Sequence, residues 1–200
     1  MSPGLSRALK TLGVFFAFAA IFAFSRHSFS TSTTTTTSTT LAAPTTTTTS
    51  ATSATTCQGS DFHGAFNQGQ GAAGTIYASV TLTKTAPGSC TIKGWPILTL
   101  QDRLGALLRS STVDLPSASN PIQFLDSRAN HPPGLVRLTS GSTTTFSLAY
   151  SDVPTGNETS CPSAQTVSVA LTRGGATVAV TPQYPPAPCD HGLIWVSPFY

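Results

Sequence analysis

The chain has 200 residues, of which 39% are hydrophobic and only 8% are charged. From residue 57 onward seven Lys and Arg residues balance seven Asp and Glu residues, so the net charge of +3 comes entirely from the first 26 residues. This balance gives the folded part no electrostatic basis for binding nucleic acid or an acidic lipid surface, and low charge with abundant Thr and Val is typical of an all-β domain outside the cytoplasm.

Residues 1–25 have the pattern of a signal peptide or a signal anchor. Basic Arg7 and Lys10 precede an apolar run over residues 12–24. This run is shorter than the roughly 20 residues that a membrane-spanning helix needs, which favours a secretory signal cleaved near residues 23–25. Two bulky phenylalanines at that end leave an uncleaved anchor as the alternative. In that case the apolar helix would be the chain's one contact with a membrane.

Residues 26–56 form a predicted disordered stalk. Of the 26 residues from 31 to 56, 20 are Ser or Thr. Such a segment cannot bury enough apolar surface to offset the entropy of an ordered chain, so we expect it to stay extended and solvated. It is either a plain flexible spacer or an O-glycosylated stalk that holds the following domain away from a membrane or through a wall layer.

From residue 57 the sequence changes to short alternating runs between turn residues, a pattern that predicts a β-sandwich or a β-barrel. The clearest run covers residues 76–83, where apolar and polar side chains alternate strictly. A type II turn at residues 86–89 then leads to a returning strand over residues 91–101, which Gly94-Trp95-Pro96 interrupts. The predicted strands cover residues 61–67, 76–83, 91–101, 106–113, 135–138, 143–151, 165–172, 176–181 and 193–196.

Two connections have distinctive sequences. Gly174-Gly175 suits a two-residue type I′ hairpin between the strands at 165–172 and 176–181. Residues 114–133 contain four prolines, which interrupt regular strand pairing, so we expect this stretch to wrap the outside of the domain as a loop. A binding function could lie in that loop.

Four cysteines in a chain with a secretion signal predict two disulfides. Cys57 precedes the first strand and Cys90 follows the next, so antiparallel strands would bring both to one end of the sheet. The same reasoning pairs Cys161 with Cys189. Each bond would close a loop of about thirty residues and contribute ~3 to 4 kcal/mol. Zinc binding is the less favoured alternative, because no two cysteines have the Cys-x-x-Cys spacing.

Short motifs in a fixed order carry a family resemblance over residues 57–200. They are Gly71-Ala72-Ala73-Gly74 before Tyr77, Cys90-Thr91-Ile92 leading to Gly94-Trp95-Pro96, Leu100 with Asp102 and Gly105, Leu138 with Gly141, Cys161-Pro162 and a last cysteine near the end. With these motifs the chain resembles an actinobacterial family of secreted proteins and lipoproteins, the domain of unknown function numbered four-two-three-two. The chain departs from the family pattern at Lys84, Trp95, Ile97 and Ser140, where Asn, Tyr, Gly and Pro are usual. The resemblance implies an immunoglobulin-like antiparallel sandwich outside the cytoplasm and brings no established activity.

The sequence marks of the common hydrolases are absent. There is no Gly-x-Ser-x-Gly, Ser-x-x-Lys or His-Glu-x-x-His pattern, and Glu158 is the only glutamate. Asp61 with His63, and Asp190 with His191, could converge on a metal or a reacting group if the two ends of the domain meet. Exposed loop positions are the favoured interpretation of these four residues, because nothing in the sequence fixes their geometry. We therefore expect no metal site and no cofactor.

Large aromatic residues are the candidates for a binding surface. Tyr77, Trp95 and Trp195, with Tyr184 beside them, could form a platform that stacks on a sugar ring or a peptide, although burial in the core is the favoured role of the two tryptophans. The hypothesis that best fits the sequence is a monomeric, non-catalytic module that recognises an envelope polysaccharide or protein. A hydrolase or metal-dependent enzyme of the envelope and a structural envelope protein are the alternatives.

Overall fold

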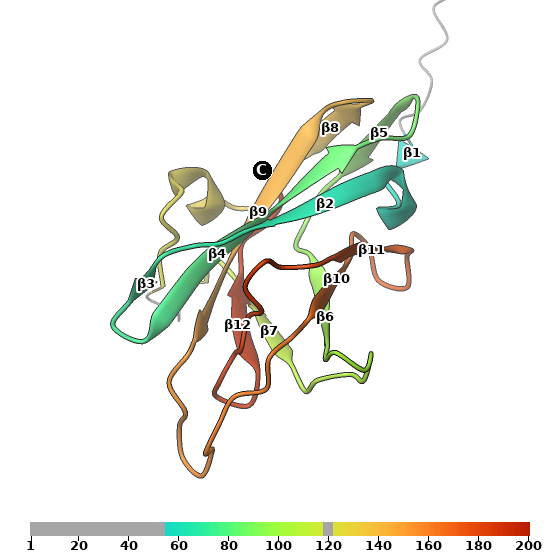
Figure 1. Cartoon of the computed structure of the whole chain (residues 1–200). Helices are drawn as coiled ribbons and strands as arrows, with labels where there is room; N and C mark the ends of the chain where they lie inside the picture. The colour runs from blue at the N-terminus through green and yellow to red at the C-terminus, as the bar shows by residue number, and fades with distance from the viewer. Residues whose placement is uncertain (1–54, 118–121) are drawn as a thin grey trace, which may run out of the picture. The chain divides into compact units, whose positions relative to one another are not determined.

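The computed structural model describes residues 55–117 and 122–200, which form an all-β domain (Figure 1). The predictions for the apolar start and for most of the Thr/Ser tract fall outside the described residues. The part of the chain that the structure describes has no helix long and apolar enough to cross a membrane. Its strands are β1 (Thr55–Thr56), β2 (Phe62–Asn67), β3 (Gly71–Ala72), β4 (Thr75–Lys84), β5 (Ser89–Ile92), β6 (Ile97–Gln101), β7 (Ser111–Asp114), β8 (Val136–Thr139), β9 (Thr143–Ser151), β10 (Thr166–Ala170), β11 (Thr177–Val180) and β12 (Leu193–Val196). Two short 3-10 helices, η1 (Gly59–Asp61) and η2 (Ser127–Asn130), accompany them.

The strands form two facing sheets and a small third one. The central sheet has the order β2-β4-β9-β12-β7, with β3 added beside β4. The second sheet has the order β11-β10-β6, and the third has the order β1-β5-β8. Most neighbours are antiparallel, as expected, but β12 pairs with β7 and β1 pairs with β5 in parallel. One continuous core cluster joins apolar side chains of the central sheet to those of the second sheet, so the two pack face to face.

The pair formed by β4 and β9 is the centre of the domain. Nine residue pairs connect the two strands, from Thr75 opposite Ser151 to Thr83 opposite Thr143. The predicted alternation is confirmed, because the inner face of this pair carries Ala78, Val80, Leu82, Phe146, Leu148 and Tyr150, all of them buried. Phe146 also meets Phe199 edge to face, with ring centroids 5.7 Å apart.

The last inner position of β4 is a lysine. Lys84 is only 2% exposed. Its Nζ donates to the carbonyl oxygens of Ala86 at 2.7 Å and Pro87 at 3.3 Å. A buried ammonium group is tolerated when hydrogen bonds replace its water, and these carbonyls do so. The lysine therefore closes the end of the core and anchors the following turn.

The outer face of the central sheet has a core of its own, which the sequence analysis missed. Residues 115–117 and 122–130, called the covering segment below, lie against this face and supply buried Leu115, Phe124 and Ala129. These side chains pack on Ala149 of β9, which is fully buried. The prediction that this region wraps the outside of the domain without regular strands is confirmed for residues 115–117 and 122–133, which contain only η2, but the sequence analysis did not foresee its buried side chains. The segment carries core side chains and covers part of a sheet.

The predicted turns are the least accurate part of the sequence interpretation. Gly88 has the positive φ of 77° that a type II turn requires, but the turn closes no hairpin. Strand β4 pairs with β2, β3 and β9, whereas β5 moves away to pair with β8 and β1. The returning strand over residues 91–101 is interrupted between Ile92 and Ile97, as predicted from Gly94-Trp95-Pro96, because Pro96 cannot donate a ladder hydrogen bond.

Two further strand predictions need correction. Strands β10 and β11 do form an antiparallel hairpin, but Ala170 lies opposite Thr177, which leaves six loop residues where two were expected. Gly174 alone of the two glycines has a positive φ, at 72°. In the region predicted as a strand over 106–113, regular pairing begins only at Ser111, and Leu107 makes a single bridge to Gln101.

Both disulfides have the pairing expected from the strand order. Cys57 is bonded to Cys90 and Cys161 to Cys189, each with a Cα–Cα distance of 4.9 Å. Thr55 and Thr56, which the sequence analysis placed in the stalk, form β1 and pair with β5 beside the first bond. Cys90 of the first bond lies within β5, whereas both cysteines of the second bond lie in loops between strands.

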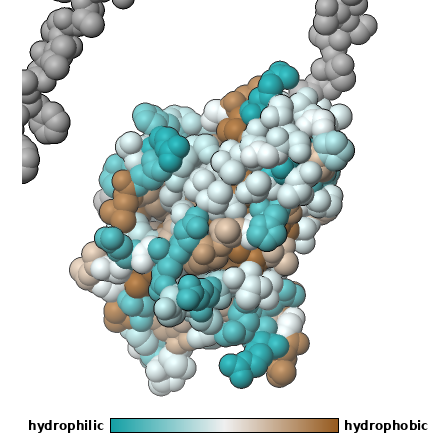
Figure 2. Space-filling model, turned by 45° about the horizontal axis from the view of Figure 1, so that its top comes forward, coloured by the Kyte–Doolittle hydropathy of each residue, from teal (hydrophilic) through white to brown (hydrophobic). Residues whose placement is uncertain are grey.

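The face drawn in Figure 2 combines hydrophilic, intermediate and hydrophobic residues. Figure 2 shows a face that is mostly pale, the colour of residues near the middle of the hydropathy scale, with hydrophobic residues in separate brown groups.

Candidate ligand-binding groove

A groove of about 330 Å³ lies on the outer face of the central sheet, beside the covering segment. Its floor comes from β4 and β9 and its two sides from the end of β2 and from the covering segment. Its lining residues are Asn67, Gln68, Gly69, Tyr77, Ala78, Ser79, Thr81, Phe124, Leu125, Asp126, Arg128, Thr145, Ser147 and Tyr200. The volume is at the lower end of the range, roughly 300 to 1,000 Å³, that is typical of small-molecule sites.

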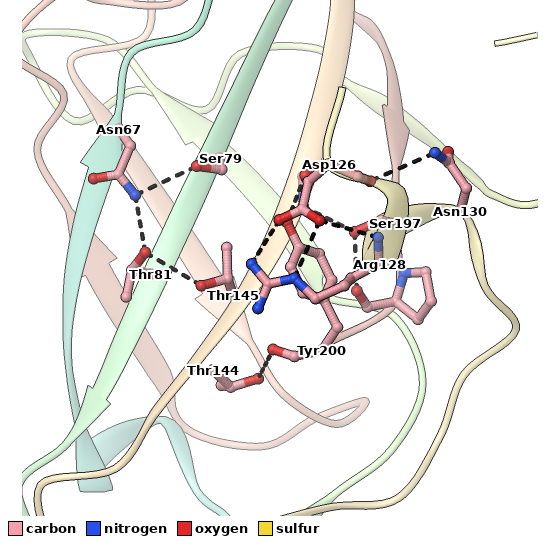
Figure 3. Close-up of polar contacts among 12 residues, drawn as sticks. Asn67, Ser79, Thr81, Asp126, Arg128, Asn130, Thr144, Thr145, Ser197 and Tyr200 are labelled. Carbon is pink, nitrogen blue, oxygen red and sulfur yellow. Dashed lines mark hydrogen bonds and ion pairs between the residues drawn. The ribbon is translucent and has the colours of Figure 1, made fainter. Parts of the chain in front are cut away.

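Hydroxyl groups from neighbouring strands make the floor of the groove (Figure 3). The side-chain amide of Asn67 donates to Thr81 Oγ1 at 2.9 Å and to Ser79 Oγ at 3.3 Å. Thr81 Oγ1 lies 3.3 Å from Thr145 Oγ1 on β9. Strand alternation places these side chains on one face, and antiparallel pairing sets them side by side. The result is a continuous polar row across β2, β4 and β9.

An ion pair forms the opposite side of the groove. Asp126 caps η2, and its Oδ1 accepts hydrogen bonds from the backbone N–H of Arg128 at 3.0 Å and from Arg128 Nε at 3.1 Å. Its Oδ2 accepts from Arg128 Nη2 at 2.7 Å. These hydrogen bonds hold the pKa of Asp126 below its ordinary value. The two charges of the groove therefore neutralise each other.

Tyr200 connects this side to the floor. Its backbone N–H and C=O both bond to Thr145, each at 2.9 Å, and its hydroxyl lies 2.9 Å from Ser147 Oγ. The guanidinium carbon of Arg128 stands 5.0 Å from the centre of the tyrosine ring, within cation–π range. Burial raises the pKa of Tyr200. The ring is thus held from three sides and is a fixed part of the groove.

The aromatic residues named from the sequence do not form one platform. Tyr77 lines the groove. Trp195 lies in the same cross-strand row, on the far side of Ala149, and packs under the covering segment. Trp95 lines a different pocket and donates its Nε1–H to the carbonyl of Leu115 at 2.7 Å, while exposed Tyr184 lines a third. Their separation follows from the fold, because Trp95 lies between two strands that belong to different sheets.

The hypothesis that Asp61 and His63 meet Asp190 and His191 is wrong. The first pair lies where Phe62 is opposite Lys84, at one end of β4. The second pair follows Cys189, whose N–H bonds to Ser151 at the other end of the long pair of β4 and β9. At about 3.3 Å per residue, the length of β4 keeps the two pairs roughly 30 Å apart. Residues 55–117 and 122–200 contain no group of three or more His, Cys, Asp and Glu side chains that could hold a metal ion.

The carboxylate of Glu158 is bonded to backbone N–H groups. Its carboxylate accepts N–H groups from His191 at 2.7 Å, Asp190 at 2.8 Å and Thr155 at 3.2 Å. These bonds lower the pKa of Glu158, the bond from His191 contributing most. Asp190 and His191 have positive φ angles of 53° and 58°, which turn both N–H groups toward the carboxylate. The only glutamate of the chain therefore connects its own loop to the loop of Asp190 and His191, beside the second disulfide.

The comparison with known protein families identifies the domain. The family model described as a domain of unknown function, DUF4232, matches residues 57–200. The chain belongs to this family. No curated protein and no solved structure matches the chain. Membership of the DUF4232 family assigns no ligand or reaction, so the groove has to be interpreted from its own chemistry.

The sequence analysis missed most of the groove. Ser79 and Thr81 alternate with core residues on β4, and Thr145 and Ser147 do so on β9, but this pattern is the same as that of an ordinary solvent-facing strand surface. A feature that could have distinguished them from an ordinary strand surface is the high number of Ser and Thr residues on the same face of two neighbouring strands. Tyr200 gave no signal, because its position depends on the return of the last residues to β9.

Proposed function

We propose that this domain is a non-catalytic recognition module outside the cytoplasm and that the groove is its binding site. One observation carries the proposal. Side-chain hydroxyl and amide groups on rigid strands form a continuous floor, and apolar Phe124 and Leu125 stand beside it. A concave site that combines apolar walls with a few fixed polar groups is the usual form of a ligand pocket.

The ionisable groups of the groove favour binding over catalysis. A general base must be free to take a proton, but Asp126 has a lowered pKa and three hydrogen bonds to Arg128. Tyr200 has a raised pKa, which disfavours the phenolate, and its hydroxyl is paired with Ser147. Neither residue is arranged to activate the other groups of the floor. These features support a site that holds its ligand unchanged.

The two disulfides support the extracytoplasmic location. Such bonds form and persist in oxidising compartments and are rare in the cytosol. The basic-then-apolar start of the chain agrees with export. For the architecture we favour an immunoglobulin-like sandwich, because two mainly antiparallel sheets face each other across one core. A module of this kind would act in the cell envelope, where the Thr/Ser tract gives it reach.

A retention experiment tests the proposal. The full chain is immobilised and exposed to cell-wall polysaccharide and envelope extracts, and the same protein is assayed against a broad panel of hydrolase substrates. We expect retention of a wall fraction without turnover. Thr81→Val should reduce retention, because it removes a hydroxyl from the floor. Thr83→Val is the matched control, since it makes the same change on the same face of β4 one pleat outside the groove.

A second pair of variants tests the apolar side. Leu125 is 71% exposed and lines the groove, whereas Leu135 is 66% exposed and lies outside its lining. Leu125→Ala should weaken retention and Leu135→Ala should not. If Thr81→Val and Leu125→Ala are both retained as strongly as wild type, the binding site lies elsewhere. Turnover that His191→Ala abolishes would replace the binding function with an enzymatic one.

A further inference from the structure

We propose that the groove recognises an uncharged carbohydrate, a neutral segment of an envelope glycan. This inference rests on the proposed function and names the ligand class of that site. The inference is based on four features of the groove: its hydrogen-bonding capacity, its apolar surface, its charge and its backbone geometry. Each of these features favours a neutral glycan over another kind of ligand.

The floor offers groups that both donate and accept hydrogen bonds. A serine or threonine hydroxyl has one donor and two acceptor positions, and an asparagine amide has both kinds of atom. Sugar hydroxyls have the same dual character. In Figure 3 the carbonyl oxygen of Asn67 points away from Ser79 and Thr81, which receive its N–H groups. The floor is therefore ordered internally, and each serine or threonine hydroxyl keeps a second acceptor position beyond the one that Asn67 uses.

The hydroxyls are spaced as a grid. Successive side chains on one face of a strand are about 7 Å apart, and directly opposite side chains on neighbouring strands are about 5 Å apart. Ser79 and Thr81 give one row of this grid, and Ser147 and Thr145 lie opposite them on β9. A ligand that matches this grid must present several hydroxyls over a small area. A sugar ring does so, whereas most small metabolites and peptide side chains do not.

The apolar side of the groove suits the C–H face of a sugar. Leu125 projects into solvent with 71% of its surface exposed, although it stands next to buried Phe124. Tyr77 adds an aromatic surface that is partly covered. Aromatic and aliphatic surfaces pack against apolar ligand faces while hydroxyls satisfy the polar edges. A ring laid between Leu125 and the floor would use both kinds of surface.

The charges and the backbone oppose the two main alternatives. An anionic polymer would have to compete with Asp126 for Arg128, and a cation would meet Arg128, which is 70% exposed. An extended peptide is usually bound through main-chain hydrogen bonds at a free sheet edge. Here the floor is the face of a sheet, where β4 already pairs with β2 on one side and β9 on the other. The ligand should therefore be neutral and rich in hydroxyls.

The experiment separates the ligand class from the existence of the site. The full chain is tested for retention on a wall fraction before and after periodate, which cleaves vicinal diols of sugars, and before and after protease. Hexaoses of glucose, mannose, galactose and arabinose serve as neutral competitors, oligogalacturonate as the acidic competitor and a Gly/Ser peptide as the uncharged peptide competitor. The NMR signals of the Asn67 side-chain amide report whether a competitor occupies the groove.

We expect periodate to abolish retention and protease to leave it unchanged. A competing neutral hexaose should shift the Asn67 amide signals, and Thr81→Val should raise its Kd about five-fold, as loss of one hydrogen bond does. Thr83→Val should leave the Kd unchanged. Groove-dependent retention that survives periodate, or that oligogalacturonate or the peptide alone displaces, would overturn the carbohydrate and keep the recognition site. Retention that is the same in Thr81→Val and wild type would overturn both.

Discussion

The two faces of the central sheet differ in what packs against them. The inner face packs on the second sheet through a continuous apolar layer, in which Phe146 and Val80 are fully buried. The outer face is covered over only part of its area, by the covering segment, and the groove lies on the uncovered part beside that segment. Both faces belong to the same strands. What differs is the partner, which is a regular sheet on one side and a short irregular segment on the other.

This difference shows how a site can be formed on a stable strand pair. The inner contacts fix the register of β4 and β9, and that register alone determines which hydroxyls become neighbours on the outer face. The covering segment then excludes water from one part of the face and leaves the other part accessible. The floor of the groove is therefore as rigid as the core beneath it, whereas its wall depends on fewer contacts.

The largest expected effect is a difference in stability between variants of the inner core and variants of the outer core. Phe146→Ala should lower the free energy of unfolding by about 3 to 5 kcal/mol, because it leaves a cavity in the inner core and removes the edge-to-face contact with Phe199. Phe124→Ala should lower the free energy of unfolding by clearly less than Phe146→Ala does, since the covering segment can detach without unfolding the sheets. Urea unfolding and amide hydrogen exchange check this: Phe124→Ala should speed exchange mainly at residues 122–130. Equal losses in both variants would mean that the two cores unfold as one.

A smaller effect is expected from the link between the cores. Trp95 donates its Nε1–H to the carbonyl of Leu115, where the covering segment begins. Trp95→Phe keeps most of the aromatic volume and removes this hydrogen bond. It should therefore lower the free energy of unfolding, measured with urea, by about 0.5 to 1.5 kcal/mol. Tyr184→Phe is the control, because Tyr184 is exposed. A loss of several kcal/mol would show that packing of the indole, and not its hydrogen bond, determines the role of Trp95.

The same comparison explains how much the sequence could predict. Strands β4 and β9 were predicted almost to the residue, because alternation with period two reports one buried face directly. The cysteine pairs followed from strand order. The covering segment was not predicted as core, because its apolar side chains are separated by prolines and polar residues and have no period. Periodicity describes regular elements, so an irregular segment that packs through a few side chains leaves no comparable signal.

The site was harder to predict than the fold for a related reason. Asn67, Thr81, Thr145 and Tyr200 come from four separate parts of the chain, and their contact depends on pairings that the local sequence does not specify. The predicted hairpin after β4 illustrates this limit. Its turn residues were assigned correctly, but the strand that follows pairs in another sheet. Local signals identify turns and strands, and long-range packing decides which strands become neighbours.

The smallest expected effect concerns the wall of the groove at low pH. The folded pKa of Asp126 is lowered by its hydrogen bonds to Arg128, so the ionised carboxylate favours the folded state. This contribution is complete above the unfolded value of 3.8 and is lost as the pH falls through the lower folded value. Because Arg128 is 70% exposed and solvent screens the pair, this contribution to the free energy of unfolding should be small. Asp126→Asn should be slightly less stable than wild type near neutral pH, and the difference should vanish in acid.

A second carboxylate provides the control for this prediction. Glu158 also has a lowered pKa, but its partners are backbone N–H groups of a loop outside the groove. Thermal unfolding across the acid range should lose part of its pH dependence in both Asp126→Asn and Glu158→Gln. The NMR signal of Arg128 Nε–H should titrate with Asp126 in wild type and in Glu158→Gln, and it should become insensitive to acid in Asp126→Asn. If that signal still titrates in Asp126→Asn, a different group holds Arg128, and the neutral wall on which the carbohydrate inference depends would have to be reassigned.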